Sequence, residues 1–497
     1  PPDTDSVLAP LLGVVCADKD EESQCGDALR KMKKEAPGAS GLFFQIIGFW
    51  NPKPHLKTMM FRRSSGRDGG SFEQLDGIRS LALMWVSAFH IYTCSVLGPW
   101  KTFEGEIQHS ILAVMEQGQC GVTMFFVLSG FLISHIFHAI RRKGDLSLLK
   151  AWKLFIYRRF WRIWPSLVVS VALVQMYASN QKGYGIFTAC GTGQFWEVMW
   201  RNMIFVWNLK PWGLEPGCAL SPEVEWSVST EFQLYLFTPL FIEAYIRKKS
   251  LGWTLCIIAM LASIYSRCWM VSTYDLWEEK TAFLRSWVTD QDHEQNILYF
   301  SSWTRANEYM VGIMTHFIWK EFSAYRESDV KNYTTTLWLA LTSIPGQIFV
   351  WGTFSVVQVW LLWNHFFWNG HYTKFLETSY MIFNFFLFSM FAAYAIIATV
   401  AMPRAQHTFI NKFISKVLSS SWLYPVASVS YTAYLMQYVA WWCFTWPTVT
   451  NIWEFALYES IMFLMSMVIG LALSLTIERP FMKIGRLIEP YVFPKDV

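Results

Sequence analysis

Charged residues are scarce in this chain. Only 16% of its 497 residues are Asp, Glu, Lys or Arg, whereas a soluble domain has about 25%. Hydrophobic residues make up 53%, and apolar stretches as long as a membrane span recur between residues 75 and 477. This balance excludes an ordinary soluble domain. We expect an all-α fold, an integral membrane helical bundle with about ten transmembrane helices, because open sheets leave backbone groups unpaired in lipid.

Cysteines and metal-ligand patterns are sparse too. Nine cysteines are too few for a disulfide framework, and no pair has metal-ligand spacing, so no metal is expected. Cys190 and Cys218 lie in one loop before the fourth apolar stretch. An oxidising compartment would favour a disulfide between them, and two buried free thiols are the alternative. No basic tract alternates with aromatic residues outside the membrane pattern, so no nucleic-acid partner is expected.

Hydropathy over a window of about 20 residues locates the spans. The ten predicted spans lie in residues 76–94, 112–137, 158–178, 228–246, 251–271, 307–320, 337–363, 377–400, 427–447 and 455–477. Pro345 and Gly346 can break the seventh. Basic clusters such as Arg247 to Lys249 all fall on one side if the chain crosses ten times. The positive-inside bias then places both ends of the 71–497 region in the cytosol.

The chain divides into three predicted parts. Residues 1–70 read as a linker with an interfacial segment, in which Val7 to Ala17 is either the end of an extra membrane helix or a docking segment. Residues 71–482 form the membrane domain, and 483–497 a cytosolic tail. We expect membrane lipids, and partners in a membrane complex, to contact this domain. The endoplasmic reticulum or the plasma membrane is the favoured location.

The stretch from Leu75 to His90 is the most informative one. It carries Arg79 and His90 eleven residues apart on one apolar helix. Eleven steps of about 100° make three turns plus about 20°, so the two side chains share a face, about 16 Å apart along the axis. A titratable imidazole deep in lipid is expensive and therefore usually functional. The alternative is a histidine that a neighbouring carbonyl satisfies inside the bundle.

Two further motifs lie in the second and third spans. Phe125 to Leu132 contains a Ser-Gly notch, which allows close approach of another helix. Arg158, Arg159 and Arg162 stand at the cytosolic start of the third span. Arginines at this spacing can clamp phosphates through bidentate hydrogen bonds, and ordinary anchoring at the membrane surface is the alternative.

An acidic residue enters the fourth span. Glu231 needs a partner inside the membrane, and His90 and Arg305 are the candidates. Other polar or aromatic side chains accompany it on the same segment, namely Trp226, Gln233 and Tyr235.

Taken in chain order, these segments resemble acyltransferase family 3, a family of multi-pass membrane enzymes. Leu75-Asp76-Gly77-Ile78-Arg79 through His90 is similar to its signature first helix. The next three family motifs match Phe125 to Leu132, Arg159-x-x-Arg162-Ile163-x-Pro165, and Trp226-Ser227 to Tyr235. The resemblance covers about residues 72–482, and the eukaryotic branch related to the nose-resistant-to-fluoxetine proteins looks nearest.

The resemblance implies transfer of an acyl group from cytosolic acyl-CoA, a co-substrate, to an acceptor hydroxyl at or across the membrane. It implies phosphate binding by Arg158, Arg159 and Arg162. Arg79 would position the donor, and His90 would act as general base on the acceptor hydroxyl. Glu231 would orient or stabilise that imidazole. The acceptor side would be formed by Trp226, Gln233, Tyr235 and Arg305.

The chain departs from the family pattern at Gln437. The family commonly has a histidine after the Tyr434-Leu435 pair, and an amide can hydrogen-bond but cannot titrate. Two rival functions stay open: a transporter or lipid-handling protein that uses the same tunnel without chemistry, and a catalytically silent structural subunit of a membrane complex. A continuous cavity from the arginines to His90 would favour catalysis.

Overall fold

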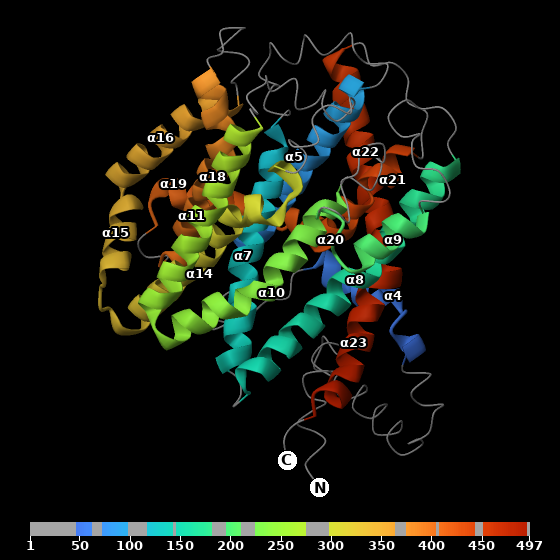
Figure 1. The fold of residues 1–497 in the computed structure, drawn as a ribbon, viewed down its shortest axis with the longest axis horizontal. Helices are drawn as coiled ribbons and strands as arrows, with labels where there is room; N and C mark the ends of the chain where they lie inside the picture. The colour runs from blue at the N-terminus through green and yellow to red at the C-terminus, as the bar shows by residue number, and fades with distance from the viewer. Residues whose placement is uncertain are drawn as a thin grey trace.

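A computed structural model describes ten stretches of the chain, in which helices are the regular structure and no strand occurs. These stretches are residues 46–61, 72–97, 117–142, 146–180, 195–209, 224–274, 298–362, 374–403, 407–442 and 451–494. Cys190 and Cys218 lie outside them, as does most of the predicted N-terminal linker. The expected all-α fold is therefore present in the described part of the chain (Figure 1).

Within the described residues, each predicted span overlaps one or two helices. The long helices are α5 (Glu73–Leu97), α7 (Gln119–Arg142), α8 (Leu148–Asn180), α10 (Glu225–Arg247), α11 (Lys249–Thr273), α14 (Ser302–Ser328), α16 (Ile344–Leu362), α18 (Lys374–Ile396) and α22 (Ile452–Leu473). The shorter ones are α4 (Pro52–Met60), α9 (Phe195–Met203), α15 (Tyr333–Leu341), α19 (Phe409–Leu418), α20 (Leu423–Leu435), α21 (Gln437–Trp442) and α23 (Arg479–Val492), with single π turns η3 (Ile397–Ala401) and η5 (Ser474–Glu478).

In the described part of the chain, fewer than ten helices are apolar enough to cross a membrane by length and composition alone. Among the described residues four pass that test: α7, α11, Thr378–Ala401 and the continuous run Trp453–Val492. A fifth is the bent pair of α15 and α16. Helices α8 and α10 carry several charged residues each, and α20 and α21 are shorter than a span, with 13 and 6 residues. An integral membrane protein is thus supported, whereas ten crossings are not confirmed.

The predicted break in the seventh span is confirmed. Helix α15 ends at Leu341, α16 begins at Ile344, and the two axes differ by 72°. Pro345 lies in the first turn of α16, where a missing backbone N–H is tolerated. A Cβ at Gly346 would lie 2.2 Å from the Ala340 carbonyl oxygen, so only glycine lets the two helices approach this closely.

Helix α7 is the centre of the bundle and contacts α5, α10, α14 and α18 (Figure 1). It crosses α14 where Gly130 faces Gly312: a Cβ at Gly130 would lie 2.3 Å from the Tyr309 carbonyl oxygen. The absence of side chains at both positions lets the two backbones touch. The predicted notch next to Ser129 is therefore a helix crossing, and it determines how far α7 stands from its neighbours.

Ion pairs join several helix ends at one end of the bundle. Glu243 of α10 binds Arg141 at the end of α7 and Arg247 one turn on, each at 3.0 Å. Lys249, which starts α11, binds Glu321 of α14 at 2.8 Å. Arg141, Arg247 and Lys249, from two of the basic clusters, thus lie at one end of the bundle. Which side of the membrane this end faces stays a prediction.

Two amphipathic helices flank the bundle. The last carbonyls of α4 accept hydrogen bonds from α20, from Tyr424 to Thr58 at 2.8 Å and from Ser428 to Met59 at 3.0 Å. Helix α23 packs along α8, and the Tyr157 hydroxyl donates to the Gly485 carbonyl at 2.8 Å. The domain boundary expected at residue 482 consequently falls inside a packed helix, and the described residues 483–494 are not a free tail.

Candidate active site

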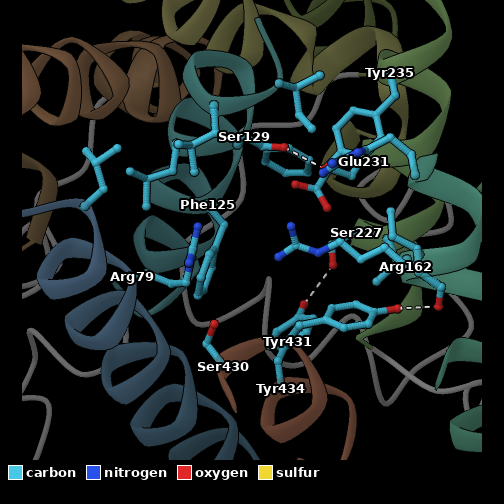
Figure 2. Close-up of a pocket in the computed structure, with 18 of the residues that line it drawn as sticks. Arg79, Phe125, Ser129, Arg162, Ser227, Glu231, Tyr235, Ser430, Tyr431 and Tyr434 are labelled. Carbon is cyan, nitrogen blue, oxygen red and sulfur yellow. Dashed lines mark hydrogen bonds between the residues drawn. The ribbon is translucent and has the colours of Figure 1, made fainter. Parts of the chain in front are cut away.

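Five helices enclose a cavity of about 440 Å³ in the described part of the bundle (Figure 2). Helices α5, α7, α8, α10 and α20 contribute its walls. One wall is apolar and follows α7 from Val122 to Ile136, about 21 Å along the helix axis. The polar side chains on the walls are Asp76, Arg79, Ser129, Arg159, Arg162, Ser227, Glu231, Tyr235, Ser430, Tyr431 and Tyr434. A long apolar wall opposite several charged groups suits an amphiphilic ligand.

Helix α5 brings Arg79 to the cavity together with Asp76. The two are one turn apart, and a guanidinium nitrogen of Arg79 lies 3.9 Å from the Asp76 carboxylate. Next to Arg79, Gly77 lets α5 approach the end of α19 closely: an added Cβ would lie 2.1 Å from the Leu418 carbonyl oxygen. Ser80 donates to the Leu423 carbonyl at 2.7 Å. Close packing on α19 and α20 thus fixes the rotation of α5 that points Arg79 inward.

Helix α8 divides the predicted arginine patch. Arg159 and Arg162 are three residues apart, share a face and line the cavity. Around the helix Arg158 lies about 100° from Arg159 and about 40° from Arg162. Its side chain nevertheless forms a bidentate pair with Glu489 of α23, at 2.7 and 2.5 Å. The structure therefore places two of the three arginines in the cavity. Directly after Arg162, the Ile163 carbonyl accepts a hydrogen bond from the Tyr431 hydroxyl at 2.9 Å, which joins α20 to α8.

Glu231 faces the arginines from α10. Its carboxylate lies beside Ser129 and Tyr235 and interacts electrostatically with Arg162 and Arg79. The Tyr235 hydroxyl is 2.8 Å from the Ser129 hydroxyl, so α7 and α10 are joined at this point. Three guanidinium groups then oppose two carboxylates, those of Glu231 and Asp76. The formal charge of the cavity is one positive unit, which favours an anionic ligand.

His90 lies next to the cavity but does not line it. Its Nδ1 is 2.5 Å from the Gln437 amide oxygen, and its ring centroid is 5.3 Å from that of Tyr438 and 6.4 Å from that of Tyr434. Because an amide oxygen accepts, Nδ1 carries the hydrogen and Nε2 keeps its lone pair. The partner of the imidazole is thus Gln437, whereas Glu231 was the expected one.

Of the predicted acceptor-side residues, only Tyr235 lines the cavity. The Gln233 amide nitrogen donates to Asn208 at 2.8 Å and to the Phe205 carbonyl at 2.5 Å. The Trp226 ring packs on Tyr299, with centroids 4.9 Å apart. These side chains hold α10 against the preceding loop and α14, because they bond or pack within the protein instead of facing the cavity.

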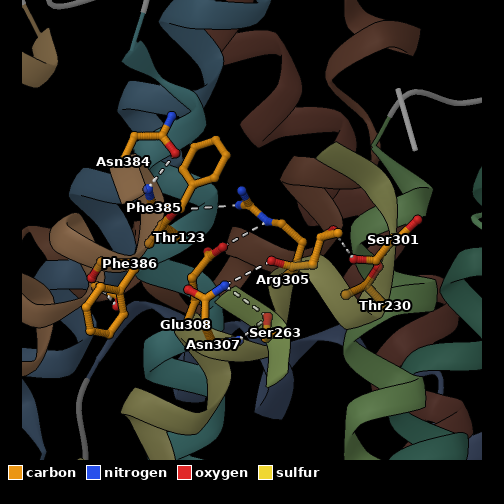
Figure 3. A network of polar contacts seen from close by, with 12 residues as sticks. Thr123, Thr230, Ser263, Ser301, Arg305, Asn307, Glu308, Asn384, Phe385 and Phe386 are labelled. Carbon is orange, nitrogen blue, oxygen red and sulfur yellow. Dashed lines mark hydrogen bonds and ion pairs between the residues drawn. The ribbon is translucent and has the colours of Figure 1, made fainter. Parts of the chain in front are cut away.

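Arg305 is fully buried in a separate network (Figure 3). Its Nε lies 3.1 Å from Glu308 on the next turn of α14, and its guanidinium stands 3.9 Å from the centroid of the Phe385 ring. Arg305 therefore pairs with Glu308 and not with Glu231. The charge pair and the aromatic ring replace water around a cation that would otherwise be costly to bury.

Some of these partners were not foreseen from the sequence. The three-residue spacing of Arg305 and Glu308 on one helix was the available signal for their pairing. Asp76 lies in the first motif, three residues before Arg79, and carries the same signal. No sequence signal pointed to the contact of Tyr434 with His90, because the two residues are 344 positions apart. No group of three or more His, Cys, Asp or Glu side chains is arranged to hold a metal within the described ranges.

A family model described as an acyltransferase domain matches residues 72–478. The chain is similar to Regulator of hypoxia-inducible factor 1 from Caenorhabditis elegans, with 26% identity over 292 residues, 54% of this chain and 54% of that protein. It is also similar to the Peptidoglycan O-acetyltransferase OatA of Listeria monocytogenes, with 26% identity over 254 residues, 49% of this chain and 33% of that protein.

The family match agrees with the resemblance seen in the motifs. The similarity to a Caenorhabditis elegans protein agrees with the expectation that a eukaryotic branch of the family is nearest. The chain spans about half the length of the first of these relatives and a third of the second. No solved structure matches the chain significantly.

Proposed function

The chain belongs to acyltransferase family 3, and we propose that it is a membrane-bound O-acyltransferase. It would move an acyl group from acyl-CoA to an acceptor hydroxyl at or across the membrane. The observation that carries this proposal is the positively charged cavity in which Arg79, Arg159 and Arg162 meet beside a long apolar wall. The family's motif residues supply all three arginines.

The donor fits this cavity by its chemistry. Guanidinium groups bind phosphate oxygens bidentately, so Arg159 and Arg162 suit the phosphates of a coenzyme A carrier. These two arginines lie on α8, whose first turns belong to the basic end of the bundle. The positive-inside bias predicts that this end is cytosolic, where acyl-CoA would enter. The apolar wall along α7 would then receive the acyl-bearing arm.

The chemistry needs a base near the thioester. In the proposed reaction His90 Nε2 takes the acceptor's proton while the hydroxyl oxygen attacks the thioester carbonyl. The new C–O bond forms, the C–S bond breaks, and the proton passes to the leaving thiolate. Gln437 supports this role, because its hydrogen bond to Nδ1 leaves Nε2 available as the base.

One observation favours a second candidate function. His90 is absent from the cavity wall, as it would be in a protein that carries a lipid or a donor molecule without reacting with it. A transporter or lipid-handling protein, or a silent structural subunit of a membrane complex, is therefore the alternative. Such a protein would still need the arginines for binding, but not His90.

The test uses the full chain purified in lipid nanodiscs with ¹⁴C-acetyl-CoA. We expect the wild type to release coenzyme A and label an acceptor, and His90→Ala to lose this activity while keeping donor binding. Leu81→Ala is the matched control, because Leu81 lies on the same helix with 42% of its surface exposed. Full activity in His90→Ala contradicts the assignment of the base. Donor binding without turnover in the wild type supports the alternative.

A further inference from the structure

Tyr434 is a neighbour of both parts of the candidate site, the arginine cavity and His90. Its side chain lines the arginine cavity, and its ring lies 6.4 Å from that of His90, which is outside the cavity wall. A thioester carbon and an attacking oxygen must come within about 3–3.5 Å of each other before they react. A donor in the cavity can therefore react with a hydroxyl beside His90 only if the Tyr434 side chain moves aside.

We propose that Tyr434 is a gate between the donor cavity and His90, closed in this structure and opened by movement of its ring. The proposal rests on the proposed function, because the gate matters only where a donor occupies the cavity. Tyr434 would act as a positioning residue: it controls whether the base and the thioester share one space.

Hydrogen bonds to α10 hold the gate closed. The Tyr434 hydroxyl is 2.9 Å from the Ser227 hydroxyl and donates to the Val224 carbonyl at 3.3 Å. Ser227 also donates to the Val224 carbonyl, at 2.7 Å. The ring of Tyr434 packs beside Phe125 of α7, with centroids 6.2 Å apart. These contacts join α20 to α10 at the cavity wall (Figure 2).

The helix is interrupted for one residue, Met436, close to Tyr434. Helix α20 ends at Leu435, Met436 leaves the helical conformation with ψ near 3°, and α21 begins at Gln437. The Leu435 carbonyl accepts a hydrogen bond from Ser170 at 3.2 Å, which compensates the interrupted helix. The gate and the partner of His90 therefore lie on two separate helical segments. The ring of Tyr434 can move without breaking the bond between Gln437 and His90.

A gate at this point would protect the donor. With Tyr434 closed, His90 cannot activate water in the cavity, so the donor is not hydrolysed while no acceptor is bound. An open gate with water in place of the acceptor gives hydrolysis: the water oxygen bonds to the carbonyl carbon, the C–S bond breaks, and the thiol leaves with a proton. Loss of the gate is therefore measurable as acyl-CoA hydrolysis without acceptor.

The experiment compares Tyr434→Phe, Tyr434→Ala and Ser227→Ala with the wild type in nanodiscs. One readout is the rate at which diethylpyrocarbonate modifies His90, followed by peptide mass spectrometry. The other is thiol release from acetyl-CoA without acceptor. Tyr434→Phe removes the hydroxyl and keeps the ring, so both rates should rise about fivefold, the value of a typical net hydrogen bond. Ser227→Ala removes one of the two partners of that hydroxyl and leaves the Val224 carbonyl, so it should raise both rates by a smaller factor. Tyr434→Ala, which removes the ring, should give a larger rise.

Tyr431→Phe is the matched control for the modification rate. Tyr431 lies on the same helix and lines the cavity, but its hydroxyl bonds the Ile163 carbonyl and not α10. Its variant should leave the modification of His90 unchanged. An unchanged modification rate in all the Tyr434 and Ser227 variants refutes the gate. So does a Tyr434→Phe protein that loses turnover with His90 modification unchanged, because its hydroxyl would then act in the chemistry.

The two proposals fail separately. If no variant and no wild-type sample turns over acyl-CoA, the proposed function is contradicted. The modification rate of His90 tests the gate whether or not the protein turns over acyl-CoA, because modification needs no catalysis.

Discussion

The crossing of α7 and α14 allows one prediction to be worked out in full. In Gly312→Ala, the added Cβ would lie 2.3 Å from the Val127 carbonyl oxygen and 2.9 Å from the Cα of Gly130. Ordinary contact begins at 3.4 Å, so the two helices must separate by about 1 Å in a core that has little free space. The obstacle is backbone on both sides, which no rotamer change can relieve.

The expected cost follows from these contacts. Overpacking of this kind destabilises by about 1–3 kcal/mol, and the better helix propensity of alanine returns about 0.5–1 kcal/mol. A net loss of about 1–2 kcal/mol is expected, with the apparent Tm falling by a few degrees. The separation would also strain the Ser129–Tyr235 hydrogen bond beside Gly130. Donor affinity should therefore fall together with stability.

The assay is thermal unfolding of the detergent-solubilised protein, followed by fluorescence-detected size exclusion. Gly352→Ala is the control, because a Cβ at Gly352 on α16 would meet no atom within 4 Å. That variant should keep its Tm or gain slightly. Equal Tm values for the two variants would refute the reasoning, since they would mean that the helices do not touch at Gly312.

Three other outcomes are expected. Arg162→Gln should raise the KM for acyl-CoA about tenfold or more, the value of one charge-assisted hydrogen bond, with little change in kcat. Steady-state kinetics test this against Arg247→Gln, because the Arg247 side chain is 67% exposed and does not line the cavity. Glu308→Gln should destabilise the protein by about 3–5 kcal/mol, because it leaves Arg305 buried without a counter-charge; a Tm equal to that of the wild type would contradict this. Burial lowers the pKa of His55 in α4 below its usual 6.5, so docking of α4 should be intact above pH 6.5 and weaken as the pH falls below it. Limited proteolysis across this range, with His55→Gln removing the pH dependence, checks the last expectation.

Local patterns predicted the elements well. Apolar runs located the helices, and the Pro345-Gly346 pair located the break between α15 and α16. The Ser-Gly notch indicated a close crossing, which is the contact of Gly130 with α14. Each of these signals depends on the preferences of neighbouring residues in the chain, which the sequence displays directly.

Partner choice was predicted poorly. Glu231 was expected to hold His90 or Arg305, yet it faces Arg79 and Arg162, while His90 binds Gln437. The choice depends on how each helix is rotated and displaced relative to the others. Those quantities come from close contacts such as that of Gly77 with Leu418, whose members are 341 residues apart in the chain.

The amino-acid sequence alone therefore determined that this protein is a helical membrane bundle, where its helices lie and which polar residues enter them, because helical periodicity and hydropathy are local properties. The tertiary structure decided the rest. It turned Arg159 and Arg162 toward the cavity and Arg158 toward Glu489, although all three share one short stretch of α8. It also brought Tyr434, on the cavity wall, to within 6.4 Å of the His90 ring. Packing between distant helices selects which face meets which, and that selection has no local signature.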